Sequence, residues 1–284
     1  MRTRAAVFAG SARWSSLVIG LGMLWFGFRL LFEALLAVIT DGDAAAYTTP
    51  AMDAFFYGTT AWGTQLQLAT FAIYLALLGL HMHLSHGLPL RCLIGRGALR
   101  HFARVSLFLL PVYVLLTYWS LADPEISRQM ALGPWLASLL ITLPVLFVQI
   151  SAEEFVFRGY LQSQLAALVR HPIVWMGVPS LLFGLIHYDP TSPPYTTWAY
   201  VAWATCLGLA VSDLTARSGT LGPALALHFV NNTFAIAVLA TDDWLYGAAL
   251  YVWPTYGLPW DPALPFEALA LFVFWLSARL AIRR

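Results

Sequence analysis

The sequence predicts an all-α, polytopic membrane protein with about eight transmembrane helices in one bundle. Of its 284 residues, 60% are hydrophobic and only 10% are charged, and the mean hydropathy is +0.72. Soluble domains carry charge on about a quarter of their residues, so this chain has too few polar side chains to cover a surface that faces water. The composition therefore excludes a soluble globular enzyme, a disordered chain and a secreted disulfide scaffold.

The charge balance and the cysteine count narrow the expected partners. The formal net charge of +1 creates no basic field, so nucleic acid is not an expected partner. The two cysteines, Cys92 and Cys206, are too few for a disulfide-built fold. The expected environment is the lipid bilayer.

Apolar segments long enough to cross a bilayer occur along the whole chain. A spanning helix needs about 20 mostly apolar residues, and the fifth and sixth of eight candidate segments are short for a full crossing. Because the stretches between them leave no room for a soluble domain, we predict a single membrane domain, 1–284. The candidate spans are 16–39, 61–80, 105–121, 134–157, 173–186, 198–211, 220–239 and 263–282.

The arginine residues predict how the chain is oriented in the membrane. Arginine precedes the first span and recurs in every second loop, whereas aspartate and glutamate occupy the intervening loops, with only Arg128 out of place. The positive-inside rule then places both termini in the cytoplasm. All fifteen basic residues are arginine, which is typical of a GC-rich, bacterial genome, so the expected location is the inner (cytoplasmic) membrane. The first apolar segment is too long for a signal peptide and is predicted to remain as a helix.

Two adjacent carboxylates lie in the fourth apolar segment. A charged side chain near the bilayer centre costs about 2.5–3.5 kcal/mol on insertion scales, and such residues usually line a functional cavity. Glu154 and Arg158 are four residues apart, so they share a helix face and are expected to pair. Glu153 points about 100° away and has no obvious local partner. A carboxylate without a paired cation is suited to accept a proton from water, as a general base must.

Two further apolar segments carry histidine. His187 is the only titratable residue of the fifth segment, whereas the seventh carries His228 and Asn232, four residues apart. A neutral imidazole N–H and an amide NH₂ on one helix face are two donors, and two convergent donors are the ingredients of an oxyanion hole. With Glu153 as base, the set fits the attack of water on a carbonyl carbon.

Three motifs carry a family resemblance. Glu-Glu-x-x-x-Arg at 153–158, Phe-x-x-x-His at 183–187 and His-x-x-x-Asn at 228–232 occur in this order, each in its own span. The chain resembles the CPBP family, the bacterial relatives of the Rce1-type CAAX prenyl endopeptidases, also called the Abi family. The resemblance covers about 141–239, and we expect the catalytic core in residues 134–240.

The resemblance implies an intramembrane endopeptidase acting on a membrane-anchored protein or peptide. In such an enzyme Glu153 and His187 would activate water, His228 and Asn232 would stabilise the oxyanion, and Glu154 and Arg158 would support them. The family implies a glutamate-type enzyme with no obligatory cofactor. Two histidines and one or two glutamates leave a zinc site open, although no His-Glu-x-x-His motif is present.

Two other functions fit the same residues. The first is a proton-coupled transporter in which glutamate and histidine relay protons. The second is a proteolytically silent scaffold or immunity protein of the same fold. Loss of hydrolysis in Glu153→Gln would favour the enzyme, and ion flux in liposomes would favour the transporter.

Several polar or aromatic residues are expected to have structural roles. Phe183 is expected to pack against His187, and Asn231 to be a packing residue that points away from Asn232. Arg29 and Glu33, four apart in the first span, are expected to pair and to face the bundle.

Two further expectations concern the position of the histidine cluster and of the fourth and fifth helices. His81, His83 and His86 are expected in a polar juxtamembrane loop, with a metal site as the alternative. For Glu153 to meet His187, the fourth helix must start later and run on past Arg158, or the fifth must be tilted or displaced inward.

Overall fold

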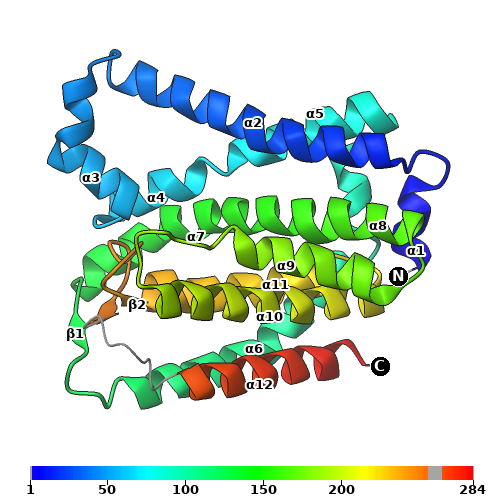
Figure 1. Cartoon of the computed structure of the whole chain (residues 1–284). Helices are drawn as coiled ribbons and strands as arrows, with labels where there is room; N and C mark the ends of the chain where they lie inside the picture. The colour runs from blue at the N-terminus through cyan, green and yellow to red at the C-terminus, as the bar shows by residue number, and fades with distance from the viewer. Residues whose placement is uncertain (1, 255–263, 284) are drawn as a thin grey trace.

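The computed structural model describes residues 2–254 and 264–283 and is a bundle of long helices whose first and last segments lie at the same end (Figure 1). The long helices are α2 (Trp14–Ile39), α5 (Ala72–His86), α6 (Ala98–Ser120), α7 (Leu132–Glu154), α10 (Pro194–Ser218) and α12 (Leu264–Ile282). The shorter segments are α1 (Arg2–Ala5), η1 (Ala6–Phe8), η2 (Ala44–Thr48), α3 (Pro50–Tyr57), α4 (Ala61–Ala69), η3 (Leu90–Leu93), η4 (Phe155–Leu161), α8 (Gln162–Leu168), η5 (Ile173–Gly177), α9 (Val178–Leu185), α11 (Gly222–Asn232) and η6 (Thr233–Val238).

Each of the eight predicted spans lies largely in helix. A turn at 70–71 interrupts the second span, and the predicted ends at 121, 186, 220–221 and 239 fall just outside helices, whereas residue 263, the predicted start of the eighth span, lies outside the described residues. Within the described chain, five helices are long and apolar enough to cross a membrane, and two shorter apolar helices and α12 supply the other three. The predicted fold class is confirmed, and the chain is a multi-pass membrane protein. The five are Trp14–Ile39, Ala61–His86, Ala98–Ser120, Leu132–Leu168 and Pro194–Ser218.

The fourth span is longer than the predicted 134–157. It runs without interruption from Leu132 to Leu168 through α7, η4 and α8, a total of 37 residues. Such a helix is about 55 Å long at 1.5 Å per residue, well beyond the hydrocarbon thickness of about 30 Å. Glu153 therefore lies inside this helix and not at its end. The expected continuation past Arg158 is confirmed, but the expected later start is wrong, because the helix begins at Leu132.

The sixth span is also longer than predicted. The expected 198–211 is the middle of α10, a helix of 25 residues. Polar residues at both ends of α10 break the apolar pattern on which the prediction rests. Half of the most apolar stretch of α10 is buried against other helices, so much of this helix does not contact lipid. The fifth span is short, as predicted, and its helix comprises Ile173–Leu185.

A small sheet at the end opposite the termini was not predicted. β3 (Tyr251–Trp253) pairs antiparallel with β1 (Ser127–Arg128) and parallel with β2 (Leu239–Thr241), in the order β1-β3-β2. The sheet ties the loop after α6 to the segments after α11 (Figure 1). Strands of two or three residues are too short to leave a period-two pattern.

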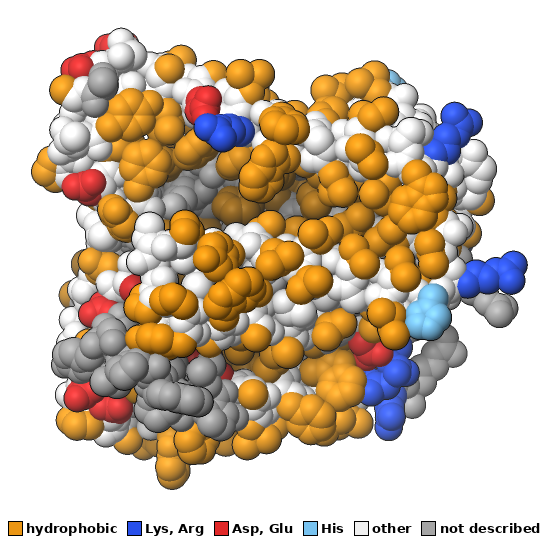
Figure 2. Space-filling view, in the orientation of Figure 1, with side chains coloured by type: hydrophobic (Ala, Val, Ile, Leu, Met, Phe, Trp, Pro, Cys, Tyr) orange, Lys and Arg blue, Asp and Glu red, His pale blue; other side chains and the backbone are white. Residues whose placement is uncertain are grey.

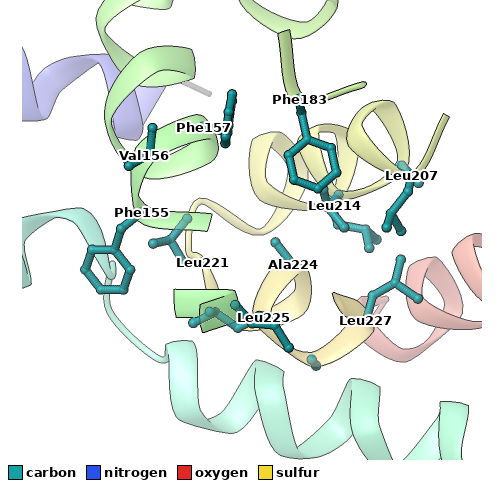
Figure 3. Close-up of a cluster of buried hydrophobic side chains, with 14 of the residues drawn as sticks. Phe155, Val156, Phe157, Phe183, Leu207, Leu214, Leu221, Ala224, Leu225 and Leu227 are labelled. Carbon is teal, nitrogen blue, oxygen red and sulfur yellow. The ribbon is translucent and has the colours of Figure 1, made fainter. Parts of the chain in front are cut away.

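Helix α11 lies in the core and packs against α6, α7, α10 and α12. Figure 3 shows Leu221, Ala224 and Leu225 of this segment in one cluster of buried side chains with residues of η4, α9 and α10, among them Phe157 and Phe183. At Gly222 an added Cβ would overlap the carbonyl oxygen of Ala98. Small residues allow such close helix approach in membrane bundles, and the approach fixes the helix that carries His228.

Charged side chains segregate along the bundle. On the face drawn in Figure 2, most basic side chains lie at the end where the chain begins and ends, and most acidic ones lie at the opposite end. Between the two ends the surface is largely hydrophobic (Figure 2). This distribution is the one expected of a protein whose middle zone contacts lipid tails.

Helix α2 forms an outer layer with α3, α4 and α5 (Figure 1). A groove lies along one face of α2. The groove has a volume of about 430 Å³ and is lined by residues of α2 together with Tyr74 of α5; Figure 2 shows this face of the molecule hollowed below α2. Arg29 and Glu33 form the predicted pair, with 2.8 Å between Nε and Oε1, but their side chains are 74% and 58% exposed. The prediction that the pair faces the bundle interior is wrong, because it lines this groove instead.

The three clustered histidines are not in a loop, which corrects the prediction for them. All three lie in the last turns of α5, where His81 is buried and His83 is exposed. His81 Nε2 lies 2.8 Å from the hydroxyl of Tyr160, and His86 contacts Ser16 and Gln164, both at 2.8 Å. The apolar residues between the histidines continue the helix to its glycine C-cap, Gly87.

Candidate functional site

The carboxylates and the arginine of the first motif lie where the helix changes its winding. Glu153 and Glu154 end α7, and Arg158 belongs to η4, a π-helix that follows directly. The second π-helix of the site, η6, follows Asn232 in the same way. π-Helical turns are rare and occur frequently at functional sites. The two helices therefore widen immediately after Glu154 and immediately after Asn232, and Arg158 lies within the first widened turn.

The predicted pair of Glu154 and Arg158 is present and completely buried. Arg158 Nη1 donates to Glu154 Oε1 at 3.1 Å, and both side chains have 0% exposure. The guanidinium also lies 4.3 Å from the ring centroid of Phe183, a cation–π contact that strengthens in a dry environment. Arg158 is thus the permanent positive charge beside the two carboxylates.

His228 of α11 contacts this pair. Its Nδ1 lies 2.8 Å from Glu154 Oε1. A carboxylate accepts hydrogen bonds and does not donate them, so Nδ1 carries the hydrogen and donates to Glu154. In the neutral imidazole Nε2 is then an acceptor.

This geometry corrects the expected role of neutral His228. The sequence predicts that the imidazole N–H and the Asn232 amide both point to a reacting oxygen, but Glu154 takes that N–H. His228 offers a second donor, at Nε2, only in its doubly protonated form.

Glu153 is buried and has no hydrogen bond within the described residues at its Oε2. This oxygen lies 3.6 Å from His228 Nε2, too far for a direct hydrogen bond. Two acceptor atoms that face each other repel unless a proton or a polar hydrogen lies between them. Glu154 Oε2 likewise has no hydrogen-bond partner among the described residues, but Glu154 pairs with Arg158 and has 0% exposure, whereas the Glu153 side chain is 8% exposed. Glu153 is therefore the carboxylate of the site that a water molecule reaches more easily.

Asn232 closes the site on the other side of His228. Its Nδ2 lies 3.2 Å from His228 Nε2, and its Oδ1 accepts from Asn231 Nδ2 at 2.9 Å. Asn231 Oδ1 in turn accepts from the hydroxyl of Tyr113 at 2.9 Å. The prediction that Asn231 is only a packing residue is wrong, because its amide joins Tyr113 to Asn232.

His187 lies two residues after the end of α9 and is half-buried. Its Nδ1 lies 2.7 Å from the backbone carbonyl of Phe183, so Nδ1 donates and Nε2 is left as an acceptor. Its ring packs on Phe183 with 4.9 Å between centroids, which confirms the predicted contact. Gly184 lets α9 approach α10, because a Cβ there would overlap the hydroxyl of Thr205.

The structure therefore brings five of the six predicted residues into one contact network and attaches the sixth through an aromatic ring. Phe183 contacts His187 and also His228, whose ring centroid lies 5.8 Å away. Among the described residues no hydrogen bond or ion pair joins His187 to Glu153 directly. The network consists of Glu153, Glu154, Arg158, His228 and Asn232.

Arg4 also supports the site. Sequence reasoning counted it only as one of the charges before the first span, but its side chain is 1% exposed. It donates to the backbone carbonyls of Leu93 and of Arg158, the latter at 3.5 Å. Burial lowers the pKa of Arg4 to about 10. No spacing in the sequence connects Arg4 to residues so far along the chain.

The donor set does not fit a zinc site as it stands. Among the residues described here, no group of three or more His, Cys, Asp or Glu side chains is arranged around one metal position. His228 has one nitrogen bonded to Glu154 and the other in contact with the Asn232 amide, so neither lone pair is free. A zinc ligand needs a free imidazole lone pair.

Comparisons with known proteins bear on the central part of the chain. Residues 134–234 match the family described as type II CAAX prenyl endopeptidase Rce1-like. The chain is also 25% identical over 239 residues to the uncharacterized protein YyaK of Bacillus subtilis (strain 168), covering 80% of this chain and 75% of that protein. No solved structure matches the chain. The matched segment contains all three motifs, so the predicted resemblance is confirmed.

Proposed function

Because residues 134–234 are an Rce1-like segment, we propose that the protein is a glutamate-type intramembrane endopeptidase whose core is residues 134–240. It hydrolyses a peptide bond in a membrane-anchored protein or peptide. The observation that carries the proposal is the buried network in which Glu153 faces His228 across 3.6 Å while Arg158 compensates Glu154. A base with available lone pairs beside donors held by an ion pair is the arrangement that hydrolysis requires.

In the proposed reaction Glu153 accepts a proton from water, and the hydroxide oxygen forms a bond to the carbonyl carbon of the peptide. His187 assists by accepting a hydrogen bond from the same water at Nε2, since its Nδ1 is bonded to Phe183. The carbonyl oxygen becomes an oxyanion. Glu153 then returns its proton to the amide nitrogen as the carbon–nitrogen bond breaks, so that an amine and a carboxylic acid leave.

The oxyanion is stabilised from α11. Asn232 donates one amide N–H, and His228 donates from Nε2 in its protonated form, with Glu154 stabilising the imidazolium through Nδ1. The two nitrogens, Asn232 Nδ2 and His228 Nε2, are 3.2 Å apart, which suits two donors that share one oxygen. Such donors stabilise charge that develops only in the transition state.

Purified protein in liposomes tests the proposal without a known substrate. A membrane-protein extract is added, newly formed amino termini are labelled, and the termini are identified by mass spectrometry. We expect discrete new termini with the parent protein and none with Glu153→Gln. Proton flux across the liposome membrane without new termini would overturn the proposal and favour a transporter.

Asn232→Ala is expected to lower the turnover number by about 10²–10³-fold, the usual loss when one oxyanion donor is removed. The Michaelis constant should change much less, because the hydrogen bond tightens only as charge develops. The measurement is steady-state hydrolysis of a quenched fluorescent peptide that carries a cleavage sequence identified with the parent protein. An equal rise in the Michaelis constant with unchanged turnover would assign Asn232 to substrate binding instead.

We also expect hydrolysis to survive removal of metal ions. The reason is that both nitrogens of His228 already have partners, and the proposed base and donors supply the charge stabilisation. The check is elemental analysis of the purified protein beside an activity assay in a chelator. One equivalent of zinc, with activity lost on its removal and regained on its return, would contradict the glutamate-type mechanism.

For the setting of the enzyme, we propose the inner (cytoplasmic) membrane with both termini in the cytoplasm. In support, the first and last segments lie at one end of the bundle, and basic side chains gather there (Figures 1 and 2). The proposed substrate reaches the site from within the bilayer. The groove along α2, lined by residues of α2 and by Tyr74 of α5, is the proposed route of entry.

A further inference from the structure

We propose that Tyr113 and Asn231 are positioning residues that hold the Asn232 amide with its NH₂ group toward the reacting carbonyl oxygen. The inference rests on the proposed function and adds two residues to the site. Tyr113 belongs to α6 and lies outside the segment 134–234 that matches the protease family. It was not among the residues that the motifs indicate.

Four hydrogen bonds connect Tyr113 to Glu154. The Tyr113 hydroxyl lies 2.9 Å from Asn231 Oδ1, and Asn231 Nδ2 lies 2.9 Å from Asn232 Oδ1. Asn232 Nδ2 lies 3.2 Å from His228 Nε2, and His228 Nδ1 lies 2.8 Å from Glu154 Oε1. This series of four hydrogen bonds runs from α6 through α11 to α7.

At its carboxylate end, Glu154 fixes which group donates and which accepts in each of these hydrogen bonds. Glu154 is paired with Arg158 and only accepts, so His228 donates from Nδ1. Neutral His228 then accepts at Nε2, and Asn232 must present its NH₂ group there. Asn232 Oδ1 is consequently turned toward Asn231, which must donate.

The tyrosine end requires the same direction. When the Tyr113 hydroxyl donates to Asn231 Oδ1, the NH₂ group of Asn231 faces Asn232. An amide has chemically distinct ends, so turning it by 180° exchanges a donor for an acceptor. Both ends of the chain thus favour one orientation of Asn232. The second N–H of Asn232 makes no hydrogen bond to any residue that the structure describes and is left for the substrate.

Once His228 is protonated, the hydrogen bonds from Tyr113 and Asn231 decide the orientation of the Asn232 amide. Protonated Nε2 is a donor, so it no longer attracts the NH₂ group of Asn232 and would favour its oxygen instead. The donation from Asn231 to Asn232 Oδ1 is then the contact that keeps the amide from turning. A turned amide would place an oxygen, not a donor, beside the developing oxyanion. Protonated His228 and Asn232 act together in the proposed step, so the hydrogen bond from Asn231 to Asn232 is needed during that step.

Stacked rings hold the tyrosine in place. The ring centroid of Tyr113 lies 3.8 Å from that of Phe274 in α12 and 5.1 Å from that of Phe234 in η6, and both rings are stacked on the Tyr113 ring. The side chain is only 7% exposed. Because these contacts involve the ring alone, Tyr113→Phe keeps the packing and removes only the hydroxyl donor.

The test is hydrolysis of the quenched fluorescent peptide by Tyr113→Phe, with activity normalised to monodisperse protein. We expect turnover to fall by about 10-fold to 100-fold, as for other small misplacements of a catalytic group, and the Michaelis constant to stay within about twofold. Tyr118→Phe is the matched control, because it makes the same change on α6 at a side chain that is 76% exposed. It should equal the parent.

A double variant separates positioning from structural support. In an Asn232→Ala background the amide is gone, so Tyr113→Phe should cause no further loss, whereas a general loss of active protein would multiply. If Tyr113→Phe does not accumulate, Asn231→Asp tests the same step, because an ionised aspartate accepts from Tyr113 but cannot donate to Asn232.

The possible failures are distinguishable. Turnover of Tyr113→Phe within twofold of the parent, or a multiplicative loss in the double variant, would overturn the positioning role while leaving the protease intact. A parent protein that cleaves no peptide would overturn the proposed function itself.

Discussion

Glu153→Gln is expected to abolish peptide hydrolysis while the protein still folds and inserts. The substitution preserves the shape of a buried side chain, but an amide cannot accept the proton of water. Folding should be unaffected, because Glu153 Oε2 has no hydrogen bond to lose among the described residues. The measurements are the release of labelled amino termini and the elution profile of the purified protein.

The matched control for this variant is Glu33→Gln. Glu33 is also a glutamate within a membrane helix, but it is 58% exposed and lines the α2 groove. It should retain turnover, with any effect confined to the Michaelis constant. Turnover of Glu153→Gln within about tenfold of the parent would remove Glu153 from the role of base.

Arg158→Ala is expected to reduce the amount of folded protein as well as activity. Removing one partner of a buried ion pair leaves the other charge without compensation and costs about 3–5 kcal/mol. The side chains of Arg158 and Glu154 both have 0% exposure, so water cannot replace the lost partner. The check is thermal unfolding in detergent together with the yield of monodisperse protein.

Two further variants test this explanation of the loss. Arg217→Ala removes an arginine, itself 51% exposed, from a partly exposed pair with the same spacing and should cost at most about 1 kcal/mol. Adding Glu154→Gln to Arg158→Ala removes both buried charges and should restore part of the lost stability, though not the activity. Arg158→Ala protein that unfolds at the same temperature as the Arg217→Ala control would show that the pair does not stabilise the bundle.

The spans and motif pairs were predictable because they depend on local sequence. Lipid requires every spanning segment to be apolar and helical, so the eight segments could be found from composition alone. Spacing of four residues places two side chains on one helix face. That rule predicted the Glu154–Arg158 pair and the packing of Phe183 on His187, and both are present.

Contacts between helices were not predictable in the same way. Helix periodicity shows which residues share a face but not which neighbouring helix meets that face. The predicted oxyanion donors illustrate this, because His228 gives its neutral N–H to Glu154 from another helix. Tyr113 and Asn231 were missed for the same reason, since 118 residues separate the two ends of their hydrogen bond.

The sequence alone therefore determined the fold class, the order of the spans and the three motifs whose side chains are proposed to carry chemistry. Only the tertiary structure decided their hydrogen-bond directions, the outward position of the Arg29–Glu33 pair and the course of the fourth helix past Arg158. The physical reason is that apolarity and periodicity are properties of each segment by itself. Hydrogen-bond direction depends instead on which donor or acceptor the packed bundle places opposite each group.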